Sequence, residues 1–218
     1  MSALFFDIDG TILSEITHEI PESALVALRK AQENGHKTFI NTGRTICSVP
    51  PMIKRIPFDG FLCGCGTHLV YEERVVFHHS IPYERGRRII KSMKDCKVEG
   101  FLEGTEDIYY SNRISRLESV ESSRRYMAGR EQSMEDTGYD FDKILIYIDK
   151  IADEERFFKE IEDVFKHIDR LGGVYECVQK EYSKATSIAY IKKELALQDD
   201  EIYAFGDSSN DFDMIKAA

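Results

Sequence analysis

Two aspartates stand one residue apart near the start of the chain, directly after a short apolar run. That run, residues 3–6, is typical of a buried β-strand, so Asp7 and Asp9 are expected where the strand ends. Open α/β sheets bind their ligands at the carboxyl ends of the strands. Two carboxylates held this close repel each other, and a protein uses such a pair to bind a cation or to transfer protons. Gly10 then allows the backbone to turn sharply.

Three further polar features occur where a strand is expected to end or a helix to begin. Parallel strands bring their carboxyl ends to one edge of a sheet, so residues far apart in the sequence can share one site there. We therefore expect these features to meet the Asp7/Asp9 pair. They are Thr42-Gly43-Arg44 after a strand over 37–41, Lys184 at the start of a helix, and Asp207 with Asn210 and Asp211 after a strand over 201–205.

The chemistry that these residue types permit is narrow. Three or four carboxylates, together with backbone and water oxygens, suit a hard cation, and Mg²⁺ above all. One aspartate can attack phosphorus and form an aspartyl-phosphate, while a second acid protonates the leaving oxygen and later deprotonates water. A threonine hydroxyl, backbone N–H groups and a lysine can hold the phosphoryl oxygens as charge builds on them. The set therefore indicates a site for phosphoryl transfer.

Strands and helices that alternate along the chain must position these residues. A helix over 23–34, between Pro21 and Gly35, separates the first strand from the second, and a third strand is expected over 58–63. This order implies parallel strands joined by helical crossovers. A hairpin over 68–79 then changes the pattern.

A second α/β domain is expected to be inserted into the first. We assign residues 1–79 and 182–218 to the core and residues 80–181 to the insert. Within the insert, the apolar and charged patterns predict several elements. These are helices over 83–94, 116–131 and 153–168, the last ended by Gly172-Gly173, and strands over 99–102, 107–111, 143–149 and 174–178.

Composition limits the class of protein. The chain has 218 residues and a net charge of −10, which argues against nucleic acid or an anionic membrane as the main partner. No apolar run approaches the roughly 18 residues that span a bilayer, and the N-terminus lacks the pattern of a signal peptide. The five cysteines are odd in number and scattered, so we expect no disulfide framework and a reducing cytoplasmic location.

The chain resembles the haloacid dehalogenase superfamily. The resemblance covers the whole chain in layout, and its long insert after the third strand is most similar to that of the Cof-type phosphatases. It implies a doubly wound parallel-sheet, Rossmann-like core with a mobile α/β cap that supplies substrate contacts. Four motifs carry it: Asp7-Ile8-Asp9-Gly10-Thr11, Asn41-Thr42-Gly43-Arg44, Lys184, and Gly206-Asp207-Ser208-Ser209-Asn210-Asp211.

The resemblance also implies a role for each matching position. Asp7 would be the nucleophile and a Mg²⁺ ligand, and Asp9 the general acid/base whose backbone carbonyl also meets the metal. The remaining positions would bind either the phosphoryl group or the metal. Thr42, Gly43, Lys184 and Asn210 are implied as phosphate-binding residues, and Asp207 and Asp211 as further metal ligands.

The chain departs from the family pattern in three places. The family usually has Asn-Gly after the third strand, where this chain has Cys65-Gly66. Pro50-Pro51 is expected to bend or restart the helix after Thr42. The core also ends soon after the last motif, so it is expected to be truncated at its C-terminus. From this we expect lower stability and an exposed sheet edge that invites self-association.

The sequence therefore predicts a Mg²⁺-dependent phosphatase of a small phosphorylated metabolite, such as a sugar phosphate, that works through an aspartyl-phosphate. A phosphomutase with the same intermediate is an alternative. A non-catalytic phosphate- or Mg²⁺-binding remnant, or a phosphoryl-accepting signalling module, is an alternative from another class. The residues that select the substrate belong to the insert, and they carry no motif that identifies them.

Overall fold

The computed structural model of the protein describes residues 1–110, 130–134 and 140–218. By their internal contacts, the residues form two compact units. The segment Thr45–Ile53 groups with the second unit, although the sequence places it in the core. The division into a catalytic core and a cap stays a prediction. The first unit comprises Met1–Arg44, Lys54–His78 and Tyr182–Ala218, and the second comprises Thr45–Ile53 and His79–Glu181.

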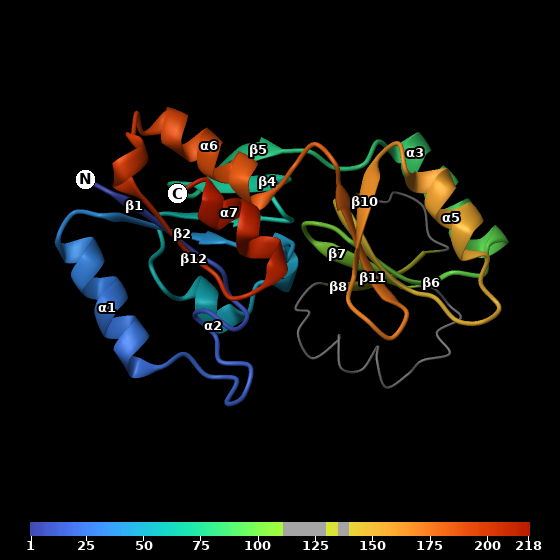
Figure 1. Ribbon diagram of the computed structural model, residues 1–218, viewed down its shortest axis with the longest axis horizontal. Coiled ribbons are helices and arrows are strands. Elements are labelled where there is room, and N and C mark those ends of the chain that lie inside the picture. The colour runs from blue at the N-terminus through green and yellow to red at the C-terminus, as the bar shows by residue number, and fades with distance from the viewer. Residues whose placement is uncertain (111–129, 135–139) are drawn as a thin grey trace. The chain divides into compact units, whose positions relative to one another are not determined.

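The first unit is built on a mixed sheet (Figure 1). Strands β12, β1, β2 and β3 are parallel, and the remaining two form an antiparallel hairpin. Within the described residues this sheet has six strands, in the order β12-β1-β2-β3-β4-β5. β1 pairs in parallel with both β12 and β2, and β2 pairs in parallel with β3, so the predicted crossover pattern is confirmed. The strands are β1 (Ala3–Phe6), β2 (Lys37–Asn41), β3 (Gly60–Cys63), the antiparallel hairpin β4 (His68–Tyr71) and β5 (Arg74–His78), and β12 (Ile202–Phe205).

The register of the parallel strands brings their carboxyl ends level. Phe6, the last residue of β1, lies opposite Phe205 of β12 and Ile40 of β2. One residue earlier, Phe5 is fully buried and stacks on Phe39, with ring centroids 5.1 Å apart. The chain therefore leaves three adjacent strands at one edge of a well-packed sheet.

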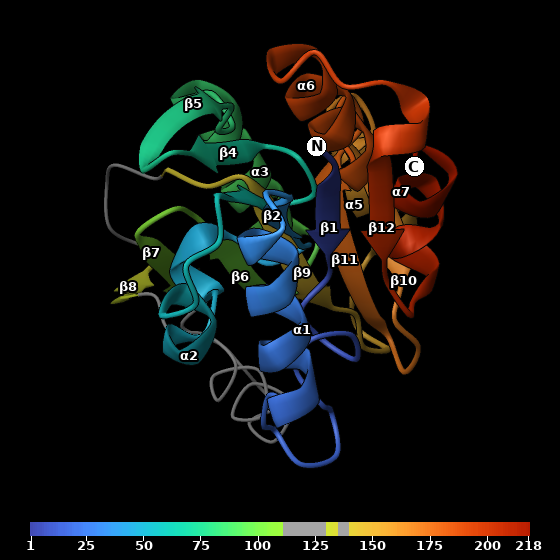
Figure 2. The same cartoon turned by 90° about the vertical axis from the view of Figure 1, so that its left-hand side faces the viewer.

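Helices lie on both faces of this sheet (Figures 1 and 2). α1 (Glu22–Glu33) lies on one face, and α6 (Lys184–Glu194) and α7 (Phe212–Lys216) lie on the other. Ser183 is the N-cap of α6, as predicted, and its hydroxyl accepts a hydrogen bond from the backbone N–H of Thr186. This is the doubly wound arrangement that the sequence predicted.

The second unit has a sheet of its own. Within the described residues its order is β10-β11-β9-β6-β7-β8, with antiparallel pairs except for the parallel pair of β7 and β8. Two helices, α3 (Tyr83–Asp95) and α5 (Glu154–Ile161), lie side by side against it (Figure 1). The strands are β6 (Glu99–Glu103), β7 (Asp107–Tyr110), β8 (Arg130–Ser133), β9 (Lys143–Tyr147), β10 (Phe165–Asp169) and β11 (Val174–Gln179).

The segment after Arg44 is not a single helix. A 3₁₀ turn over Ile46–Ser48 ends before Pro50, and α2 (Pro51–Lys54) starts again at the second proline. Proline fixes φ and lacks an N–H, so it fits the first position of a helix but not its interior. The predicted restart at Pro50-Pro51 is therefore confirmed.

The helix predicted over 153–168 is wrong in its second half. α5 ends at Ile161, and Phe165–Asp169 forms β10, which pairs antiparallel with β11. The glycines that were expected to end a helix instead form a hairpin turn, in which Leu171, Gly172 and Gly173 all have positive φ. Apolar residues spaced three and four apart favour a helix, but over so short a stretch that preference is outweighed by the antiparallel pairing with β11.

The charged helix predicted over 116–131 falls mostly outside the described residues. Its last two residues, Arg130 and Glu131, lie inside that part of the chain and belong to the strand β8. At this end the helical prediction is wrong, since parallel pairing with β7 decides the conformation. In the described part of the chain, every helix is too short or too polar to span a membrane.

A buried charge cluster stabilises the sheet of the second unit. The Glu176 carboxylate forms ion pairs with Lys143 and with Arg170, and the Lys143 Nζ lies 3.5 Å from Glu103 Oε1. Burial alone would raise the pKa of Glu176, but the charges of Lys143 and Arg170 outweigh it and lower this pKa from 4.5 to about 2. Glu176 is therefore held as a carboxylate.

Replacing Glu176 by glutamine is expected to lower the free energy of unfolding at pH 7 by about 3 kcal/mol. Because the folded-state pKa is depressed, this stabilisation is present above pH 4.5 and is lost as the pH falls towards 2. Urea unfolding followed by circular dichroism at pH 7 and pH 3 measures the difference. The exposed Glu155 of α5 supplies the control variant, Glu155→Gln. A loss that is equal at both pH values would contradict the assignment.

Candidate active site

Three adjacent parallel strands end beside one another and deliver the predicted acids and the threonine. The backbone N–H of Asp7 continues the ladder by donating to the carbonyl of Phe205, at 2.9 Å. The N–H of Thr42 does the same to the carbonyl of Leu62, also at 2.9 Å. Asp207 follows the end of β12 by two residues. The sheet therefore fixes the backbone at each of these positions before any side chain interacts.

Lys184 is the centre of a buried ionic cluster. Its Nζ lies 2.8 Å from Asp7 Oδ1 and 2.5 Å from Asp211 Oδ1, and all three side chains are almost inaccessible to solvent. The capped first turn of α6 holds Lys184, and the side-chain amide of Asn41 donates to the Lys184 carbonyl at 2.9 Å. The structure thus brings together residues 7, 184 and 211, as the sequence predicted.

Burial and charge act in opposite directions on this cluster. Burial alone lowers the pKa of Lys184, but the Asp7 and Asp211 carboxylates outweigh it, so the pKa lies above its ordinary value. Burial raises the pKa of Asp7, and the nearby Lys184 charge offsets only part of that rise. Lys184 is therefore a fixed positive charge beside a carboxylate that has lost most of its hydration. Such a carboxylate is poorly solvated and well oriented, as a nucleophile should be.

Asp211 holds the loop that carries Asp207. One Asp211 oxygen faces Lys184, and the other accepts from the backbone N–H groups of Asp207 at 3.2 Å and Ser208 at 3.0 Å. The Ser208 hydroxyl lies 3.1 Å from that oxygen and also close to the side-chain oxygen of Asn210, so its one hydrogen is shared between the two acceptors. Both Asp211 oxygens are thus engaged, whereas Asp207 projects its carboxylate from the loop.

Three of the acids lie close enough together that they could hold a metal ion. Asp7, Asp207 and Asp211 each offer a carboxylate oxygen, and these oxygens all lie within 4.8 Å of one another. The Thr11 hydroxyl orients Asp207 by donating to its Oδ1 at 2.9 Å. Gly10 leaves room for the same carboxylate, because a Cβ at Gly10 would lie 2.2 Å from Asp207 Oδ2. Oxygen donors with this charge and spacing fit a hard divalent cation such as Mg²⁺.

Gly10→Ala is expected to displace the Asp207 carboxylate and to weaken Mg²⁺ binding by about tenfold or more. Gly35 supplies a matched control, because its φ of +79° is nearly the +77° of Gly10 but no atom lies within 4 Å of its Cβ position. Gly35→Ala therefore carries the backbone strain without the clash. Titration calorimetry with Mg²⁺ measures both variants, and equal losses of affinity would show that strain, not the carboxylate, is responsible.

Asp9 and the Thr42 loop are held in place by hydrogen bonds of their own. Arg44 holds Asp9 through two hydrogen bonds of 2.7 Å, one to each carboxylate oxygen. The Thr42 hydroxyl is buried and accepts from the Arg44 backbone N–H at 3.2 Å, and the Thr42 carbonyl accepts from the Cys65 N–H, also at 3.2 Å. Gly43, between Thr42 and Arg44, is also buried in this loop.

The turn at the family's Asn-Gly position packs against the start of α6. Cys65 and Gly66 both have positive φ, and a Cβ at Gly66 would lie 2.5 Å from the Ser183 carbonyl. Glycine is therefore required at 66 by close contact, while Cys65 adopts a conformation that asparagine tolerates better than cysteine does. The turn thereby supports the capped helix end that presents Lys184.

Sequence reasoning assigned no role to Asn41, Thr11 or Arg44. Asn41 is a fully buried amide that directly follows the apolar pair Phe39-Ile40, and that contrast is a signal the sequence does contain. Thr11 lies within the first motif, and Arg44 within the second. Their partners, Asp207 and Asp9, are distant in sequence, so only the folded chain reveals these contacts.

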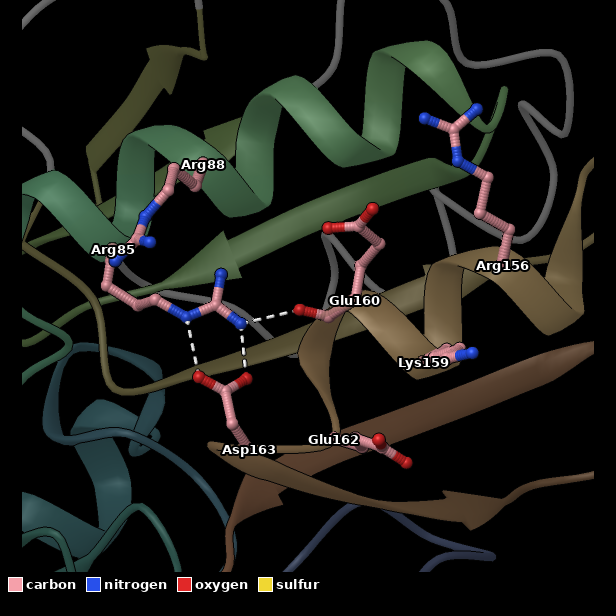
Figure 3. Close-up of a pocket in the computed structure, with 7 residues that line it drawn as sticks. All are labelled: Arg85, Arg88, Arg156, Lys159, Glu160, Glu162 and Asp163. Atoms are coloured by element: carbon pink, nitrogen blue, oxygen red, sulfur yellow. Dashed lines mark hydrogen bonds and ion pairs between the residues drawn. The ribbon is translucent and has the colours of Figure 1, made fainter.

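A hollow of about 440 Å³ lies elsewhere, between α3 and α5 of the second unit (Figure 3). Its Arg85 is committed to Asp163, through two hydrogen bonds, and to the Glu160 carbonyl. The other charged groups that line it are spread along α3, α5 and the residue that follows α5, and they do not converge on one point. None of the predicted site residues lines this hollow. The full lining is Arg85, Arg88, Arg156, Lys159, Glu160, Glu162 and Asp163.

Comparison with known families decides the class of the protein. The family of haloacid dehalogenase-like hydrolases matches residues 4–218. The chain belongs to this family. The resemblance drawn from the four motifs is therefore confirmed, and the protein is an enzyme of the hydrolase class.

Several relatives of this chain, one of them with a solved structure, are named as phosphatases. The putative phosphatase YkrA of Bacillus subtilis is 27% identical over 98% of this chain and 82% of its own length. The 5-amino-6-(5-phospho-D-ribitylamino)uracil phosphatase YitU of the same species is 23% identical over 97% of this chain and 82% of its own. The solved phosphatase BT1666 of Bacteroides thetaiotaomicron superposes with a TM-score of 0.82 at 23% identity, over 100% of this chain and 81% of its own. This structural likeness confirms the predicted fold of the haloacid dehalogenase-like hydrolase.

Proposed function

We propose that this protein is a Mg²⁺-dependent phosphatase that hydrolyses a small phosphorylated metabolite through an aspartyl-phosphate on Asp7. The observation that carries the proposal is the buried contact of Asp7 with Lys184 at the carboxyl end of β1, beside the acids that follow β12. A desolvated carboxylate, a fixed cation and a set of metal-binding oxygens at one point are what phosphoryl transfer requires.

In the first step, an Asp7 oxygen attacks phosphorus and the bond from phosphorus to the leaving oxygen breaks. Asp9 donates a proton to that leaving oxygen. Thr42, through its hydroxyl, Gly43, through its N–H, and Lys184 stabilise the phosphoryl oxygens as charge accumulates on them. The products of this step are the free alcohol and Asp7 as a mixed anhydride with phosphate.

In the second step, Asp9 accepts a proton from water, and the water oxygen attacks phosphorus. The bond from phosphorus to the Asp7 oxygen breaks, which releases inorganic phosphate and restores both aspartates. Asn210 contributes to phosphate binding from the loop after β12, where its side chain is fixed by Ser208. Over the two steps, one ester and one water give one alcohol and one phosphate.

When bound, Mg²⁺ neutralises the negative charge shared by the carboxylates and the phosphoryl group. Asp7 and Asp207 would hold it directly, together with the backbone carbonyl of Asp9. Asp211 completes the metal site, and its oxygens already accept from Lys184 and from the loop backbone. We therefore assign Asp211 chiefly to fixing the position of Lys184 and Asp207.

The names of the relatives support a small phosphorylated substrate. YitU acts, by its name, on a phosphorylated ribitylamino-uracil, and another structural relative is a sugar phosphatase. We extend only this class, a small phosphate monoester such as a sugar phosphate, to the present chain. The five cysteines, all within the described residues, are buried and form no disulfide, which supports the proposed location in a reducing cytoplasm.

Phosphate release from a panel of sugar phosphates, nucleotides and phosphorylated vitamins tests the function, with Mg²⁺ present and after its removal by a chelator. Turnover that requires Mg²⁺ is the expected result. Metal binding without turnover across the panel would favour a non-catalytic role. Activation by a sugar bisphosphate would identify a phosphomutase.

We also propose that the sheet of the first unit self-associates through β12. This strand is the outermost of the described strands on its side, and Tyr203 and Phe205 expose about half of their surface. Unpaired backbone groups beside exposed aromatic rings favour edge-to-edge pairing. Size-exclusion chromatography with light scattering should show a dimer that Tyr203→Lys dissociates. A monomer at every concentration would contradict the proposal.

A further inference from the structure

The Arg44–Asp9 ion pair occupies both oxygens of the acid on which the proposed mechanism depends. The Nε of Arg44 donates to Asp9 Oδ2 and a terminal guanidinium nitrogen donates to Asp9 Oδ1, each at 2.7 Å. The leaving-group oxygen needs one of these Asp9 oxygens as its proton partner. While both bonds to Arg44 are made, neither oxygen is fully available to the substrate.

The backbone of Arg44 is anchored on both sides, so the side chain is the part that can change partners. Its N–H donates to the Thr42 hydroxyl at 3.2 Å, and its carbonyl accepts from the Gly64 N–H at 2.8 Å. The side chain of Arg44 is 13% exposed and that of Asp9 is 37% exposed. A ligand can therefore reach the pair from the Asp9 side, next to the loop that binds the phosphoryl group.

A phosphoryl group is a chemically matched competitor for this arginine. The planar guanidinium forms the same forked pair of hydrogen bonds with phosphate as with carboxylate. Two anions next to one cation compete for it, and a phosphoryl group that carries two charges competes well.

We propose that Arg44 is a positioning residue that exchanges partners, holding Asp9 in the substrate-free protein and passing to the phosphoryl oxygens when substrate binds. The exchange frees an Asp9 oxygen, which can then take a proton from water and donate it to the leaving group, only when a phosphoryl group is present. This inference rests on the proposed function, since Asp9 acts there as the proton donor. It adds a coupling between substrate binding and the availability of the acid.

Competition for one cation can be measured without turnover. The probe is inorganic phosphate, bound to the Mg²⁺-loaded full-length protein and followed by calorimetry in a cycle of Asp9→Ala, Arg44→Gln and the double variant. Arg44→Gln is expected to weaken phosphate binding by about tenfold, and Asp9→Ala to strengthen it by about tenfold, because it frees the arginine. The gain from Asp9→Ala should vanish when Arg44→Gln is also present.

Two results would overturn the exchange. One is a phosphate affinity that Arg44→Gln leaves unchanged. The other is a gain from Asp9→Ala that persists in the double variant, because loss of a negative charge would then be its whole cause. Arg44→Lys, which keeps the charge but not the fork, should bind phosphate with intermediate affinity and serves if Arg44→Gln fails to fold.

Lys37→Gln is the matched control. It breaks another ion pair of the first unit, that of Lys37 Nζ with Asp59 Oδ1 at 2.8 Å, at the opposite end of β2, and should leave the phosphate affinity unchanged. A protein that follows the cycle but hydrolyses no ester contradicts the proposed phosphatase and not the exchange. If the protein is an active phosphatase but none of the three variants changes the phosphate affinity, only the exchange is contradicted. Absence of phosphate binding to the wild-type protein would overturn both.

Discussion

Asp7→Asn is expected to reduce phosphate release by at least about a thousandfold while the protein remains folded. The amide has the shape of the carboxylate, and its oxygen can still accept from Lys184, but it cannot form the anhydride with phosphate. Burial raises the pKa of Asp7, which means that its charge is held at a cost in free energy. A neutral amide removes that cost, so the melting temperature should be unchanged or higher.

The two readouts must be measured together. Phosphate release from the best substrate of the panel reports catalysis, and thermal unfolding followed by circular dichroism reports folding. Asp199→Asn removes a charge from an exposed acid of the same unit, paired only at the surface with Lys192, and should change neither. Near-normal turnover by a folded Asp7→Asn protein would refute Asp7 as the nucleophile. Lost activity with a collapsed melting curve would show a structural role instead.

Lys184→Met is expected to abolish turnover and to destabilise the protein by about 3–5 kcal/mol. Methionine fills a similar volume, but it leaves the Asp7 and Asp211 carboxylates buried without their cation. Since the pKa of Lys184 is raised in the folded state, its stabilisation is fully present below the unfolded value of 10.5 and is lost as the pH rises past the folded value. The difference between the variant and the wild type should therefore be large at pH 7 and shrink at strongly alkaline pH.

A second substitution separates the two effects of this lysine. Lys184→Met combined with Asp211→Asn removes one of the two stranded charges and should recover part of the stability, as measured by urea unfolding. It should recover no turnover, because the positive charge that stabilises the phosphoryl oxygens is still missing. A Lys184→Met protein as stable as the wild type would contradict the buried ionic cluster. Recovery of turnover in the double variant would contradict the catalytic role of Lys184.

Local pattern was sufficient for the elements that carry the site. The strand over 37–41, the helix after Pro21 and the Ser183 cap were all predicted, because each depends on neighbours in the sequence. The alternation of strand and helix implied parallel strands, and parallel strands place Asp7, Thr42 and Asp207 at one edge. That the acids at the beginning and end of the chain approach one another could therefore be foreseen.

Local pattern failed where pairing with another segment of the chain outweighed it. Phe165 and Ile168 fit the apolar stripe of a helix, yet they belong to β10, because pairing with β11 around the Gly172-Gly173 turn offers a complete hydrogen-bond ladder. The strand conformation of Arg130 likewise depends on β7, which is distant in sequence. Such pairings depend on partners that no short window contains.

The amino-acid sequence alone was enough to indicate the family and the fold and to predict which residues approach one another, since motif spacing and strand order are properties of the chain itself. The folded structure was needed to show how the charges are distributed among their partners. In the structure, Arg44 is paired with Asp9, and Asp211 accepts hydrogen bonds from Lys184 and from the loop backbone. Asp7 is buried. Distance and burial set the strength of an electrostatic interaction, and both arise only when distant segments pack together.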